Sequence, residues 1–508
     1  MSAQSNELFD IIKSLTPQEK TFFKAYFLKT KDESYTPSFL ILFDAMNELE
    51  AYDRQELKLL LDKKGFRANY FKAQTYLTEA ILKALTEYHT ETENTIRIGH
   101  LLQQANVLIK KNLTSVAKKY FDRARKIADS NTMYEYQLLL DHLEFTFNKK
   151  DPATMDGFIQ KVAQDMKTFQ LETDLRKAGV DSLHLSFEHF DKHVPKNVLR
   201  KKVTATLQSL NNIEKVLPLN NFSKSRFYNS KTQCLMILEQ KAEMSKTLQE
   251  FLHYLKTLPS TNAFFAKTVL HGYNSIIIAQ AYQLDYPGVE RTFLAADRYF
   301  HSLAPKICTP DISSLYYSYI VENILAFFND SGQPEKTMSV WEENKKEILQ
   351  FDKKTAVSLY LLNVGLAEFM LGNYHQAVRI ANKIAYEKSR PAVFCEGSLL
   401  LLLSHYELNN LDILPVLAKR AKRSYEKETM FNPALKIFLT FFEKKAGSFA
   451  SKTEEKKELA EVLEQIKRTK KESNQGNTTG SINMIAWLES KMRNNPYTEQ
   501  IRKNAEAN

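Results

Sequence analysis

The chain has 508 residues, a formal net charge of +10, 43% apolar residues and 26% charged residues. These values are ordinary for a folded protein and exclude a disordered, collagen-like or disulfide-scaffold class. Glycine and proline, with 13 and 14 copies, occur at about half of their average frequency. Large β architectures need many tight turns made of these residues, so the composition favours helices.

The cysteines, Cys234, Cys308 and Cys395, lie far apart and form neither a CxxC pair nor a cysteine–histidine ligand pattern. This spacing does not support a disulfide framework or a structural zinc site, so we expect free thiols in a reducing compartment. The first residues lack the basic start and apolar core of a secretory signal. Every apolar run is far shorter than the roughly 18 residues of a membrane span. We therefore expect a cytoplasmic protein without membrane insertion.

Helix-start signals recur along the chain. Thr16-Pro17-Gln18-Glu19 places a capping threonine before a proline at the first helical position, with a glutamate three residues after the cap. The cap-then-proline pattern recurs elsewhere, at Thr36-Pro37, Asp151-Pro152, Thr309-Pro310 and Asn432-Pro433. Between these starts apolar residues recur at helical spacing, and no run of alternating strands is visible. The sequence therefore predicts an all-α protein.

The predicted helices form an N-terminal helical domain, 1–92, and a longer repeat region, 93–470. The first holds about five helices: 7–14, 17–29, 37–50, 53–63 and 68–90. The second divides into about nine helical hairpins: 95–110/113–129, 131–149/153–170, 173–190/196–215, 222–239/242–257, 262–283/286–302, 311–329/334–350, 355–371/374–388, 391–408/411–426 and 432–446/452–469. In the remainder, 471–508, we expect a polar loop, one helix at about 482–493 and a disordered tail from Asn494.

Two segments carry small residues where paired helices would touch. In 361–385, Gly365 and Ala377 take these positions and Gly372-Asn373-Tyr374 makes the turn. The segment 101–124 shows a small–small–large–small series: Ala105, Ala117, Phe121 and Ala124. Small residues let paired helices approach, and large ones fill the groove of the next hairpin.

Both segments resemble tetratricopeptide (TPR) repeats, with departures at Glu368 and Ala381. The resemblance implies a right-handed TPR-like α-α superhelix, a solenoid of about nine hairpins whose first helices line the concave face. A third segment, near the N-terminus, is similar to bacterial TPR-like proteins of unknown function, and this similarity implies no activity. It contains Leu15, Glu19, Lys20, Phe22, Phe23, Lys24 and Tyr26.

The chain contains no GxxxxGK[ST], GxGxxG, HExxH or GxSxG motif, which disfavours an enzyme and predicts no cofactor. His184, His189 and His193 could hold a metal, because the last two share a helical face. The stretch runs into Pro195, however, so a solvated helix end is the favoured interpretation and no metal site is predicted.

Two clusters could contact nucleic acid or an acidic partner. Lys419, Arg423 and Lys427 form one stripe of a helix, and a solvated outer face is the alternative interpretation. The pair 53–63/68–90 could be a helix-turn-helix, with base-reading residue types at the start of its second helix: Arg67, Asn69, Lys72 and Gln74. Against DNA contact, the apolar stripe of that helix continues to Tyr88 and suits a helix buried in a bundle.

The TPR register predicts which side chains line the concave face. On one first helix they are Leu102, Asn106, Ile109 and Lys110, and on another they are Leu359, Leu362, Leu366, Phe369 and Met370. The second set is apolar and suits an amphipathic helix or extended peptide lying in a groove. The alternative is that these residues pack against a neighbouring hairpin.

These patterns favour a non-enzymatic scaffold or adaptor that binds a protein or peptide in the concave groove. An alternative is a peptide- or signal-responsive regulator whose N-terminal helices contact DNA or a signalling protein. A third class, an enzyme with a site assembled in space, would need a deep pocket lined by groups with perturbed pKa values.

Overall fold

A computed structural model gives the structure of the protein. It describes residues 7–28, 38–90, 93–131, 133–148, 152–190, 196–216, 221–258, 260, 263–305, 307–351, 357–384, 391–427, 433–444, 451–473 and 482–506. Within these ranges the regular elements are helices and none is a strand, so the predicted all-α class is confirmed. No helix of the described ranges combines the length and the apolar character needed to cross a bilayer.

The chain divides into two compact units, Met1–Gln170 and Leu171–Asn508. The helices of the first unit are α1 (Glu7–Ser14), α2 (Pro17–Leu28), α3 (Ser38–Glu48), α4 (Arg54–Lys63), α5 (Tyr70–His89), α6 (Asn94–Lys110), α7 (Thr114–Ser130), α8 (Tyr134–Asn148) and the start of α9 (Pro152–Phe190). The predicted boundary after residue 92 falls between α5 and α6, and it stays a prediction.

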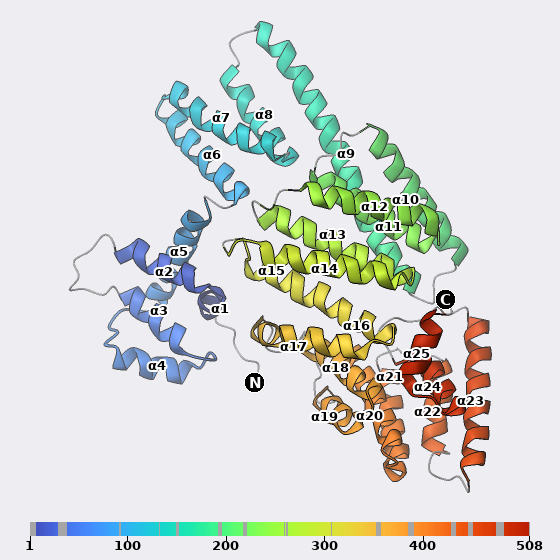
Figure 1. Ribbon diagram of the computed structural model, residues 1–508. Helices are drawn as coiled ribbons and strands as arrows, with labels where there is room; N and C mark the ends of the chain where they lie inside the picture. The colour runs from blue at the N-terminus through green and yellow to red at the C-terminus, as the bar shows by residue number, and fades with distance from the viewer. Residues whose placement is uncertain are drawn as a thin grey trace. The chain divides into compact units, whose positions relative to one another are not determined.

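The second unit begins with the remainder of α9. Its further helices are α10 (Lys196–Val216), α11 (Asn221–Ile237), α12 (Lys241–Thr257), α13 (Ala263–Tyr282), α14 (Tyr286–Ser302), α15 (Pro310–Leu315), α16 (Glu322–Asp330), α17 (Pro334–Phe351), α18 (Val357–Met370), α19 (Tyr374–Ile384), α20 (Pro391–Glu407), α21 (Leu414–Lys427), α22 (Pro433–Lys444), α23 (Lys452–Ser473), α24 (Met484–Arg493) and α25 (Tyr497–Glu506). From α10 to α14, and again from α16 to α23, each helix packs against the next one along the chain (Figure 1).

The predicted start of the second helix is confirmed at atomic level. Thr16 Oγ1 accepts a hydrogen bond from the Glu19 backbone N–H at 3.2 Å, and Glu19 Oε2 accepts one from the Thr16 N–H at 2.8 Å. This reciprocal pair satisfies two N–H groups that a helix start leaves without partners. At the other predicted starts, α15 begins at Pro310, whereas Thr36-Pro37, Asp151 and Asn432 lie outside the described residues.

Small residues lie where paired helices cross, as their spacing predicts. A Cβ atom added to Gly365 would be 2.9 Å from a Leu400 methyl group and 3.0 Å from an Ile380 methyl group. Ala117 and Ala124 of α7 are fully buried against the neighbouring helices. These contacts join helices that were predicted to pack against each other. The right-handed superhelix and the TPR relationship stay predictions.

Two local predictions are wrong. The helix break predicted between residues 170 and 173 does not occur, because 153–170 and 173–190 form the single 39-residue helix α9; the junction contains neither glycine nor proline. The segment after Asn494 is not a disordered tail, since Tyr497–Glu506 forms α25. Its apolar residues are too few to show helical periodicity, and packing against other helices stabilises it.

Candidate functional site

A groove with a volume of 460 Å³ crosses the first helices of three successive hairpins in the second unit. Its walls come from α9, α11 and α13, and each contributes side chains at helical spacing. The lining residues are Arg176, Gly179, Val180, Leu183, Ser225, Arg226, Asn229, Ser230, Gln233, Phe264, Lys267, Thr268 and His271. The volume lies within the range of about 300–1,000 Å³ that is usual for ligand sites.

A buried carboxylate fixes the junction between α9 and α11. Glu172 is 1% exposed and accepts hydrogen bonds from Ser223 Oγ at 2.5 Å and from Arg226 Nη1 at 2.7 Å. The Arg226 guanidinium is thereby held at a defined place in the groove wall.

Apolar side chains form an uncovered ledge along the groove. Val180, Leu183 and Phe264 are 68%, 49% and 46% exposed, respectively. The first two lie one turn apart on α9, and the third lies near the start of α13. Burial of this ledge by an occupant would release a favourable free energy of about 25 cal/mol for each Å² covered.

Polar side chains of α11 and α13 also line the groove, and hydrogen bonds join the helices beside it. Ser182 Oγ donates to Gln233 Oε1 at 2.9 Å, which joins α9 to α11. Asn323 Nδ2 donates to Asn274 Oδ1 at 2.8 Å, which joins the helix α16 to α13. In the groove lining, Asn229 Oδ1 is buried and accepts no hydrogen bond. Asn229 is therefore an amide in the groove wall whose hydrogen-bonding capacity is only partly used.

The titratable groups in the lining are cationic or neutral. Arg176, Arg226 and Lys267 are cations, and Lys267 Nζ lies 2.9 Å from the exposed carboxylate of Asp311 outside the lining. Desolvation, and secondly the Lys267 ammonium, lower the pKa of His271, although the residue as a whole remains exposed to solvent. A neutral imidazole can both donate and accept a hydrogen bond.

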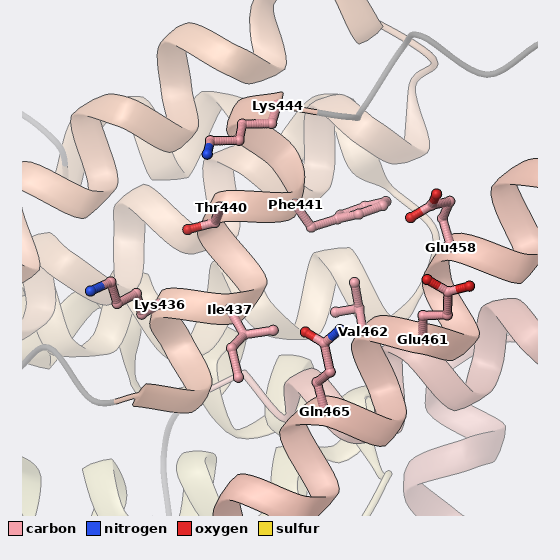
Figure 2. Close-up of a pocket in the computed structure, with 9 residues that line it drawn as sticks. All are labelled: Lys436, Ile437, Thr440, Phe441, Lys444, Glu458, Glu461, Val462 and Gln465. Atoms are coloured by element: carbon pink, nitrogen blue, oxygen red, sulfur yellow. The ribbon is translucent and has the colours of Figure 1, made fainter.

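A second hollow, with a volume of 410 Å³, lies between α22 and α23. Figure 2 shows its apolar floor, which includes Phe441 and Val462, with Lys436 on the α22 side and Glu458 and Glu461 on the α23 side. It lies within one hairpin, and its charges of opposite sign face each other across the floor. The groove of α9, α11 and α13 extends over several hairpins, which suits a longer occupant, so we take it as the candidate functional site.

The predicted apolar concave residues on α18 are covered by the chain itself. Phe369 and Met370 are 2% and 7% exposed. The Tyr497 ring of α25 lies 5.6 Å from the Phe369 ring, and Thr498 Oγ1 donates to the Met370 carbonyl oxygen. Leu362 and Leu366 are likewise buried, and Leu359 is half-buried in the same core. The structure thus shows packing against neighbouring helices here, and partner binding by this set stays a prediction.

The other predicted concave set does not gather into one surface. Leu102 is buried in the core of α6, α7 and α8, and Ile109 is half-buried. Asn106 and Lys110 are exposed. Neither hollow includes these residues, so their role in partner binding also stays a prediction.

The predicted basic residues lie on the surface. Lys419, Arg423 and Lys427 are exposed along α21, which is compatible with both a binding stripe and a solvated outer face.

The predicted DNA-contacting residues lie at the start of α5. Arg67 and Lys72 are exposed, and Gln74 is half-buried. Asn69 caps the helix, since its Oδ1 accepts a hydrogen bond from the Lys72 N–H at 3.1 Å. Asn69 thus has a structural role, and the exposure of Arg67 and Lys72 leaves DNA contact as an open prediction.

The histidine cluster is only partly described. His184 Nδ1 lies 3.5 Å from Glu188 Oε1, whereas the side chain of His189 and the whole of His193 lie outside the described residues. Among the described residues no group of histidine, cysteine, aspartate and glutamate side chains has metal-binding geometry.

Two carboxyl groups outside the groove have raised pKa values. In the first unit, burial and the neighbouring Asp141 carboxylate raise the pKa of Asp165 to about 6. In the second unit, burial raises the pKa of Glu396 to about 7, although the Tyr425 hydroxyl donates a hydrogen bond to it at 3.1 Å. Both groups therefore take up protons at a higher pH than free carboxyl groups do.

Sequence reasoning missed the groove of α9, α11 and α13. The signal was present in α11, where Arg226, Asn229 and Gln233 recur at helical spacing, but a solvated helix face shows the same pattern. A comparison of the sequence with family models and with curated proteins finds no match.

Proposed function

We propose that the protein is a non-enzymatic interaction scaffold that binds an extended segment of a partner protein in the groove of α9, α11 and α13. The observation that carries this proposal is the combination, in one groove, of an exposed apolar ledge with amide and hydroxyl side chains in the lining from α11 and α13. An extended peptide has apolar side chains to place on such a ledge and backbone N–H and C=O groups to pair with amides.

The volume and the accessibility of the groove favour an extended polypeptide segment as the ligand over a small molecule enclosed in a cavity. Val180 and Leu183 on α9 and Phe264 on α13 stay accessible, so an occupant need not be engulfed. The bridges from Ser182 to Gln233 and from Asn274 to Asn323 hold neighbouring helices in place. A preorganised wall lowers the entropic cost of binding.

Site-specific photo-cross-linking in the cell of origin tests this proposal. A photoreactive amino acid replaces Leu183 or Phe264 in the groove, and Leu294 on α14 serves as the control. Leu183 and Leu294 are the same residue type and are each 49% exposed. We expect one discrete protein adduct at both groove positions and none at Leu294. Equal labelling at all positions, or labelling at Leu294 alone, would contradict the proposal.

The alternative regulator is favoured by one observation, the exposure of Arg67 and Lys72 at the start of α5. In that case the first unit contacts DNA or a signalling protein, and the groove senses a peptide. Substitution of both residues by alanine would then abolish DNA binding measured by fluorescence anisotropy. If the native chain and the double alanine variant bind DNA equally well, or if neither binds it, the DNA form of this alternative is contradicted.

A further inference from the structure

We infer that the segment bound in the groove is acidic, with carboxylate side chains interspersed among apolar ones. This inference rests on the proposed function, because it specifies the occupant of the same groove. It starts from the charge of the lining: Arg176, Arg226 and Lys267 contribute cations, and no aspartate or glutamate is among the lining residues.

The nearby carboxylates do not cancel this charge. Glu172 lies behind the wall, 1% exposed, with Arg226 Nη1 at 2.7 Å and Arg176 Nε at 3.7 Å. Asp311 pairs with Lys267 at 2.9 Å from a position that is largely exposed, so its attraction is screened by solvent. Neither carboxylate belongs to the lining, so the charged side chains that line the groove are all cationic. An arginine has several N–H donors and can bind more than one carboxylate oxygen at a time.

The cations lie at two places along the groove, which sets a spacing for the ligand. Arg176 and Arg226 meet at Glu172, at the junction of α9 and α11, whereas Lys267 belongs to the next first helix, α13. Packed helices are about 8–10 Å apart, and an extended chain advances about 3.3 Å per residue. Two carboxylates about three residues apart can therefore reach both places.

The apolar ledge favours a peptide over a nucleic acid. Val180, Leu183 and Phe264 lie in the same groove as the cations, and a phosphate backbone would leave the aliphatic side chains among them uncovered. A peptide that places apolar side chains on the ledge and carboxylates on the cations uses both kinds of surface. Charge complementarity of this sort mainly governs specificity and association rate.

Peptide selection on the full-length protein tests the inference. A phage library of random 12-residue peptides is selected on the native chain, on the double variant Arg176→Glu/Lys267→Glu and on the control Lys246→Glu. Lys246 is exposed on α12 outside the groove and lies 4.0 Å from Glu250. Thermal melts confirm that each variant is folded. We expect the native chain and the control to enrich acidic peptides with apolar residues, whose Kd weakens about tenfold or more in the double variant.

The other outcomes would overturn the acidic inference alone or the acidic inference together with the proposed function. Groove-dependent peptides that are neutral or basic would overturn the acidic inference and retain the proposed function. Peptides that bind equally well to the native chain and the double variant, or no enrichment at all, would overturn both. A labelled single-stranded oligonucleotide is measured alongside, and its tight binding to the native chain with loss in the double variant would assign the groove to nucleic acid.

Discussion

Replacement of Asn229 by leucine is expected to stabilise the unbound protein. The buried Oδ1 atom of Asn229 accepts no hydrogen bond, and an unpaired buried acceptor costs about 1–3 kcal/mol. Because the residue as a whole is only half-buried, we expect the lower end of this range, a gain of about 1 kcal/mol in the free energy of unfolding. A residue that lowers stability in a groove wall is explained by a role in binding.

The matched control is the same substitution at Asn323. Its Nδ2 atom donates to Asn274 Oδ1 at 2.8 Å, so Asn323→Leu removes a hydrogen bond worth about 1 kcal/mol and leaves Asn274 without its donor, at about 1 kcal/mol more. The two variants should therefore differ by about 3 kcal/mol, with opposite signs relative to the native chain.

Urea unfolding followed by tryptophan fluorescence measures this difference. The two tryptophans, Trp341 and Trp487, both lie in the second unit, so the signal reports the unit that contains the groove. Asn229→Leu should move the midpoint to higher urea, and Asn323→Leu should move it to lower urea. Equal destabilisation by the two substitutions would refute the assignment of Asn229 as an unsatisfied groove residue.

The remaining predictions concern other parts of the chain. The pKa of Glu396 is raised from 4.5 to about 7, so its contribution to stability is full below pH 4.5 and is lost as the pH rises through 7. In urea unfolding, the free energy of unfolding of Glu396→Gln should exceed that of the native chain by about 3 kcal/mol at pH 8.5 and match it at pH 4. The pKa of Asp165 is raised from 3.8 to about 6, so its effect on stability has the same sign. Asp165→Asn should raise the free energy of unfolding by about 1 kcal/mol at pH 7, after allowance for solvent screening, and should leave it unchanged below pH 4. Unfolding followed by circular dichroism measures this difference. Phe369→Ala should cost about 3–5 kcal/mol, since the ring is 2% exposed; a loss below 1 kcal/mol in tryptophan-monitored unfolding would contradict its place in the core. Asn69→Ala should cost about 1 kcal/mol through loss of the α5 cap, whereas Lys72→Ala should leave the circular dichroism melt unchanged.

Local sequence signals predicted the helices well because the physics behind them is local. The capping pair of Thr16 and Glu19 acts within one turn, and the small residue at Gly365 is needed where helices cross. The helix break predicted between residues 170 and 173 had no such signal, since that stretch of α9 contains neither glycine nor proline.

The candidate site depended on contacts that no local pattern contains. The sequence pattern around Phe369 and Met370 predicts an open apolar groove. In the structure these residues pack against α25, which lies more than a hundred residues further along the chain. Conversely, the spacing of Arg226 and Asn229 is typical of a solvated helix face. They line a groove only because α9, α11 and α13 lie next to one another in the fold.

The contact between α25 and α18 also sets an order of events during protein synthesis. Thr498 and the carbonyl of Met370 are 128 residues apart. Ribosomes add roughly 5–20 residues per second, so about 6–25 s pass between the synthesis of Met370 and that of Thr498. Until then α25 cannot pack on the apolar end of α18. During that interval newly made chains on neighbouring ribosomes present the same uncovered surface to one another. The rate of translation through 371–497 therefore sets how long each nascent chain is exposed to aggregation.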